Sequence, residues 1–199
     1  MRLIENPMIG CDVMSFISLA QISAIMMDGS SDMNEKLKLE RGLTTAAAVF
    51  CGVAIAFHNA KVEVDGVECP YLLTPSMATI NEPDSRDGSY IYITTNPGGF
   101  YEMPKPDSRI ENGICIYASF DIENPFVEFY YGDIVMCTVT IPKEGIPQIT
   151  MCDKALLKDA YMQNAYEVIS NACTTSITNV EMARLHGYKK GHDAAMNGE

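Results

Sequence analysis

Residues 42–57 read GLTTAAAVFCGVAIAF, a run without a charged side chain, and the predicted fold is arranged around this segment. Three of its small residues, Ala48, Gly52 and Ala56, are spaced four apart and fall on one stripe of a helix. Such a stripe allows another backbone to come close, because little side chain intervenes. Two interpretations follow: a buried central helix that crosses another helix of the same chain, or a contact between subunits.

The composition indicates one globular domain. A chain of 199 residues can bury a substantial core, and a hydrophobic content of 47% distinguishes it from disordered proteins. The net charge of −12 repels phosphate backbones, so nucleic-acid binding is not expected. The acidic residues are scattered rather than grouped in dense rows, which argues against mimicry of DNA.

The cysteines and the apolar runs bear on the compartment. The seven cysteines form no CxxC pair and show no zinc spacing, and no secretory signal is evident in the first ten residues. Reduced core thiols in the cytoplasm are the simplest expectation. The apolar runs at 13–27 and 43–57 are shorter than the roughly 20 residues that a membrane span needs, so no membrane insertion is expected.

Residues 1–60 are expected to form a helical hairpin. Asp12 can cap a first helix that runs to about Met27, and Asp32 with Glu35 resembles a capping box for a second. Gly42 leaves two possibilities. Either one long helix passes from solvent into the core, or, as we prefer, Gly42 ends one helix and a following threonine caps the next.

Residues 61–152 alternate between apolar and polar positions, which is typical of strands. Asp65-Gly66 predicts a tight hairpin in which Glu63 faces Glu68 on the solvent side. Because short turns join consecutive strands, we expect a central antiparallel meander of about six to eight strands. After the hairpin, these strands are expected at 89–95, 100–103, 114–121, 126–131, 134–141 and 146–152.

Residues 153–199 are expected to form two helices, which completes a single α+β domain over 1–199. Asp153 can cap the first helix, and Thr178 with Glu181 forms a capping box for the second. The second helix carries Gly187 and Gly191, another small-residue stripe. It also holds the only basic concentration in the chain, formed by Arg184, His186, Lys189, Lys190 and His192.

No sequence motif for catalysis, a cofactor or a metal site is present, so none of these is expected. A short repeat, Pro-Asp-Ser-Arg, ends at Arg86 and again at Arg109. Shared turn chemistry explains it, or else two loops present both guanidinium groups to an anionic, nucleotide-like ligand. Tyr90 and Tyr92, on the strand after the first repeat, would contribute to such a site.

Aromatic residues concentrate between Tyr90 and Tyr131 and alternate between both faces of the expected sheet. A face that no helix covers would expose tyrosine and phenylalanine, which is typical of protein contacts.

We therefore expect a non-enzymatic binding or assembly protein that self-associates or binds a protein partner. A short acidic chain with 13 methionines also fits a viral or phage accessory protein. One alternative is a protein that binds or sequesters a small anionic ligand. Another is a metal-dependent hydrolase that uses His192 and Asp193, although only His58 and His186 remain to supply further imidazoles.

Overall fold

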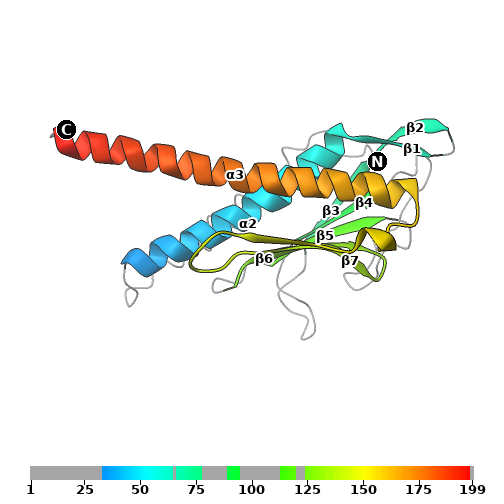
Figure 1. The fold of residues 1–199 in the computed structure, drawn as a ribbon, viewed down its shortest axis with the longest axis horizontal. Coiled ribbons are helices and arrows are strands. Elements are labelled where there is room, and N and C mark those ends of the chain that lie inside the picture. The colour runs from blue at the N-terminus through cyan, green and yellow to red at the C-terminus, as the bar shows by residue number, and fades with distance from the viewer. Residues whose placement is uncertain (1–32, 65, 78–88, 95–112, 120–123, 198–199) are drawn as a thin grey trace.

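In the computed structural model, two long helices cross over one face of an antiparallel sheet (Figure 1). The helices are α2 (Met33–Asn59) and α3 (Ala160–Asn197). The structure describes residues 33–64, 66–77, 89–94, 113–119 and 124–197. The helix expected at 12–27 and the strand expected at 100–103 lie outside these residues.

The main sheet is a meander in which each strand pairs with the next one along the chain. The expected α+β class with antiparallel strands is therefore confirmed. The first strand of this sheet, β3 (Leu72–Met77), was not expected, because Pro75 interrupts the sequence pattern. It lies at the edge of the sheet, where a proline is tolerated because no N–H is needed on the open side. The strands are β3 (Leu72–Met77), β4 (Ser89–Thr94), β5 (Ile114–Ser119), β6 (Phe126–Tyr131), β7 (Ile134–Thr140) and β8 (Gln148–Met151).

A separate two-stranded sheet, formed by β1 (Lys61–Val64) and β2 (Val67–Pro70), precedes the meander. Its register is the predicted one, with Glu63 opposite Glu68, and Gly66 adopts a positive φ of 77° in the turn. The Lys61 ammonium lies 2.8 Å from the Glu68 carboxylate and so offsets the repulsion between the two acids. The hairpin thus lies beside α3 as an element separate from the main sheet, with a charged, exposed face and with Val62 and Cys69 buried on the other.

Helix α2 continues through Gly42, so the predicted break at this residue is wrong. A Cβ at position 42 would lie 3.0 Å from Cγ of Pro125, ahead of β6, so this glycine permits close packing instead of ending a helix. Thr45 does not act as a cap, because its hydroxyl donates to the carbonyl of Arg41 one turn earlier, at 2.8 Å.

The two helices expected after residue 152 are likewise one, α3. Asp153 caps only the short 3₁₀ helix η1 (Lys154–Leu156), and the carboxylate of Asp159 accepts a hydrogen bond from the Met162 N–H, 2.8 Å away, at the start of α3. The hydroxyl of Thr178 donates to the Thr174 carbonyl within the helix. The apparent capping box at Thr178 therefore marks no boundary.

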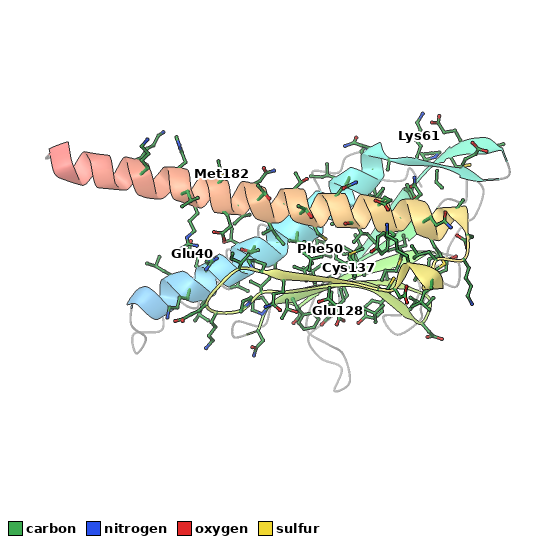
Figure 2. The ribbon with its side chains drawn as sticks, viewed as in Figure 1. Glu40, Phe50, Lys61, Glu128, Cys137 and Met182 are labelled. Carbon is green, nitrogen blue, oxygen red and sulfur yellow. The ribbon has the colours of Figure 1, made fainter. Side chains whose placement is uncertain are left out.

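The core lies between the sheet and the two helices. Burying each of its large side chains is worth about 1.5–3 kcal/mol, so this layer provides much of the folding free energy. Figure 2 shows Phe50 between α2 and the sheet. The largest fully buried side chains are Leu43, Val49, Phe50, Val53, Phe57, Ile93, Ile114, Ile116, Val127, Phe129, Met136 and Ile169.

An aromatic chain connects the C-terminal end of α2 to the start of α3. Tyr71 lies between Phe57 and Tyr161, with ring centroids 4.9 and 5.5 Å away, and Tyr131 continues the series at 5.7 Å from Tyr161. The Tyr71 hydroxyl donates to the side-chain oxygen of Asn164 at 2.7 Å. Burial raises the pKa of Tyr71 well above its ordinary value.

Helices α2 and α3 approach each other closely at Gly52. A Cβ there would lie 2.0 Å from Oγ and 3.2 Å from Cβ of Ser176, a buried residue of α3. Only a glycine in α2 leaves room for Ser176 at this separation.

Replacing Gly52 with alanine should lower the free energy of unfolding. Alanine gains about 1 kcal/mol of helix propensity, but crowding in a packed core costs about 1–3 kcal/mol. Chemical denaturation measures the difference, and adding Ser176→Ala should recover part of the loss. Gly187→Ala is the control, because a Cβ there meets nothing within 4 Å and should leave stability unchanged or higher. Equal effects at positions 52 and 187 would contradict the close contact.

Stability should fall as the pH rises above about 10, the ordinary pKa of tyrosine. The unfolded chain releases the Tyr71 proton there, whereas the folded chain retains it up to its raised pKa, so rising pH favours unfolding. Tyr71→Phe should make this decline shallower, while losing about 1 kcal/mol at neutral pH with the hydrogen bond to Asn164. Urea denaturation at a series of alkaline pH values tests this, with Tyr166→Phe as the control for loss of a hydroxyl. An unchanged slope in the Tyr71 variant would refute it.

Candidate interaction surfaces

The small residues predicted as an interface in α2 have different environments. Gly52 serves the contact between α2 and α3 of the same chain, which is the first of the two interpretations given above. Ala48 and Ala56 are half-buried, and Ala56 packs against the core. Packing within one chain thus explains why small residues occupy positions 52 and 56.

The C-terminal part of α3 extends beyond the body of the protein (Figure 1). Met182 is 62% exposed and Leu185 is 64% exposed, and the space around Gly187 is open. The surroundings of Gly191 lie outside the described part of the structure, so its predicted contact stays a prediction. We call residues 182–197 the α3 extension; Figure 2 shows Met182 where it begins.

A clamp centred on Arg41 holds α3 just before the extension. The guanidinium of Arg41 donates through Nη2 to Glu181 at 2.9 Å and to the carbonyl of Gly145 at 2.8 Å. The other carboxylate oxygen of Glu181 lies 3.3 Å from Arg184. The clamp therefore joins α2, α3 and the β7–β8 loop. Sequence reasoning missed it, because 140 residues separate Arg41 from Glu181 and no local pattern links them.

The residues predicted to bind an anionic ligand are only partly described. Arg86 and Arg109 lie outside the described residues. The backbone of β4 places Tyr90 opposite Tyr117 and Tyr92 opposite Cys115 on β5. The pairing therefore puts both tyrosines in line with the same face of the sheet. The ligand site itself stays a prediction.

The face of the sheet away from α2 and α3 is aromatic and polar. Glu128 is central on this face, opposite Tyr117 on one side and Thr138 on the other, and it accepts a hydrogen bond from the Tyr130 hydroxyl (Figure 2). The rings of Tyr117 and Phe126 lie 5.6 Å apart. Tyr117 is only 2% exposed, so the centre of this face is well packed rather than open.

Two of the described cysteines, Cys152 and Cys173, are not arranged as nucleophiles. Cys137 on β7 and Cys173 on α3 are both fully buried. A hydrogen bond with Cys137, together with burial, raises the pKa of the Cys173 thiol. Burial also raises the pKa of Cys152. Because the thiolate is the reactive form, Cys152 and Cys173 are held in their unreactive, protonated form.

The metal-dependent hydrolase gains no support from the described residues. They include no group of three or more His, Cys, Asp or Glu side chains placed to hold a metal ion. His58 follows Arg41 by 17 residues of α2, roughly 26 Å, whereas His186 lies just beyond the partner of Arg41 on α3. These two imidazoles therefore cannot share one ion. The side chains of His192 and Asp193 are not described.

Helix α2 is long and apolar enough over Leu37–Asn59 to cross a membrane, judged by length and composition alone. Membrane insertion was not expected, because the uncharged run within this helix is shorter than the roughly 20 residues of a span. Half of the most apolar window is buried inside the fold, against the sheet and α3. The core helix of a globular domain has the same length and composition.

Breaking the clamp should destabilise the protein more than breaking an exposed ion pair. A double-mutant cycle with Arg41→Met and Glu181→Gln should give a coupling of about 1–2 kcal/mol, because both side chains are about a quarter exposed and hydrogen-bonded. The same cycle on Lys61 and Glu68, which are mostly exposed, should give about 0–1 kcal/mol. Chemical denaturation provides the values. A clamp coupling no larger than that of the exposed pair would contradict the assignment.

Compared with known proteins, the chain matches no family model, no curated protein and no solved structure.

Proposed function

We propose that this chain is a non-enzymatic assembly protein that self-associates through the α3 extension. The observation that carries the proposal is the exposure of Met182 and Leu185 on a helix that has left the body of the protein. These side chains are three residues apart and lie near each other on the helix surface. Large exposed apolar side chains grouped on a projecting element are typical of interaction surfaces.

The stability of the extension supports the same proposal. An isolated helix of about 12–15 residues is only marginally stable in water. Gly187 and Gly191 each lower helix stability by about 1 kcal/mol relative to alanine. From Met182 to Lys190, every side chain whose burial is described is exposed, so contacts with the rest of the chain contribute little there. A second molecule packed against the extension would supply the missing stabilisation.

The surroundings of the titratable groups also favour assembly over catalysis. Among the described residues, the thiols with raised pKa values are protonated, and no metal-binding group is present. The most buried part of the sheet face away from the helices is filled by Tyr117 and its neighbours. We therefore infer that the exposed helix has a binding role and that the protein is not an enzyme.

Removing the apolar side chains of the extension should dissociate the assembly. Light scattering after gel filtration, with native mass spectrometry, should show a defined oligomer for the wild type and a monomer for Met182→Gln/Leu185→Gln. Ile55→Gln is the control, because Ile55 is 41% exposed on α2 and follows Arg41 of the clamp by 14 residues, roughly 21 Å along the helix. A wild type that stays monomeric at the highest soluble concentration would rule out self-association.

Hydrogen exchange provides an independent readout of the same prediction. Amides of residues 182–197 should be protected in the wild-type assembly and should exchange rapidly in the monomeric double variant. Equal protection in both would mean that the extension is stabilised within one chain.

A further inference from the structure

We infer that the α3 extension docks head to tail onto the acidic end of a second copy of this chain. This inference rests on the self-association proposed above and specifies its geometry. The extension would leave its own body and meet the opposite end of its neighbour, so each copy would both donate and accept a contact. Such a heterologous contact generates rings or open filaments.

The first argument is the charge of the extension. From Met182 to His192 the sequence contains Arg184, Lys189 and Lys190 and no carboxylate, in a chain whose net charge is −12. Lys189 and Lys190 are exposed, and neither forms an ion pair with another described side chain. The remainder of the chain is therefore even more acidic than the net charge indicates, and it attracts these cations.

The lysines of the extension are not explained by stabilisation of the C-terminal end of α3. Basic residues stabilise a helix when they lie in its last turn, close to the negative end of the helix dipole. The last turn of α3 contains none. Lys189 and Lys190 lie about two turns before the end, so they are not placed to stabilise the terminus.

The order of the charges argues against a symmetric contact between two extensions. In an antiparallel pair centred on Gly187, Arg184 of one copy would lie opposite Lys190 of the other. Like charges across an interface are unfavourable, so the small-residue stripe does not lead to a two-fold pairing. Carboxylates on an acidic partner surface would instead attract these cations.

The acidic surface lies where α3 begins, at the far end of the longest dimension from the extension (Figure 1). The β1–β2 hairpin packs beside α3 there, and Asp159 caps the helix. Asp133 lies in the turn after Tyr131, whose ring contacts Tyr161 in the first turn of α3. The described carboxylates at this end outnumber the lysines; they are Glu63, Glu68, Asp133, Asp153, Asp159 and Glu167, against Lys61, Lys154 and Lys158.

The salt dependence of association distinguishes the two geometries. Raising NaCl from about 0.1 M to about 1 M shortens the Debye length from about 10 Å to about 3 Å. Sedimentation velocity of the wild type should show association that weakens as salt rises. Association that strengthens with salt would overturn the head-to-tail geometry, because screening would then be relieving repulsion between like-charged extensions.

Two charge reversals with the same change in net charge should act in opposite directions. Lys189→Glu places an acid on the extension and should raise the dissociation constant about tenfold or more at low salt. Lys158→Glu makes the acidic end more acidic and should tighten association; Lys158 is exposed and precedes α3. If both reversals weakened association equally, net repulsion would be the cause and the geometry would be wrong.

The remaining outcomes separate failure of this inference from failure of the proposed function. A wild type that never associates at low salt would remove both. An oligomer that Met182→Gln/Leu185→Gln dissociates but Lys189→Glu/Lys190→Glu does not affect would keep the assembly and overturn the head-to-tail contact. A monomeric wild type that binds a single-stranded oligonucleotide through Lys189 and Lys190 would overturn the inference in favour of a polyanionic partner.

Discussion

The arrangement of this protein depends on the contact between α2 and α3 at Gly52. Ser176 occupies the space that a Cβ would need, so the two helix backbones can approach and still share one face of the sheet. That approach lets α2 contact β3, β5 and β6 while α3 contacts β7 and β8. A wider separation would leave part of the apolar sheet face exposed to water, at a cost of about 25 cal/mol for each Å².

Local sequence patterns predicted most strands of the sheet correctly, but they predicted the helix boundaries poorly. The turn at Gly66 and the pairing of Glu63 with Glu68 were predictable, because a tight turn fixes register within a few residues. Gly42 and Thr178 were misread for the opposite reason. A glycine either ends a helix or allows a neighbour to pack closely, and Pro125, which decides between these roles here, is 83 residues away in the sequence.

The candidate interaction surface was predictable in composition but not in position. The basic residues and the glycines after Thr178 stand out in an acidic chain, and those whose burial is described, from Arg184 to Lys190, do lie together on exposed helix. The clamp between Arg41 and Glu181, which marks where α3 leaves the body, depends on tertiary contact alone. The ligand predicted from Arg86 and Arg109 depends equally on tertiary placement, and both arginines lie outside the described residues.

The continuity of α3 makes it a lever. Its first half is fixed by the core, and from Ser176 to Asn197 the helix spans roughly 30 Å at 1.5 Å per residue. A small change in the angle at which α3 crosses α2 is therefore magnified at the free end, in proportion to this length. The fit between one glycine and one serine sets not only the packing of the core but also the direction in which the far end of the molecule reaches.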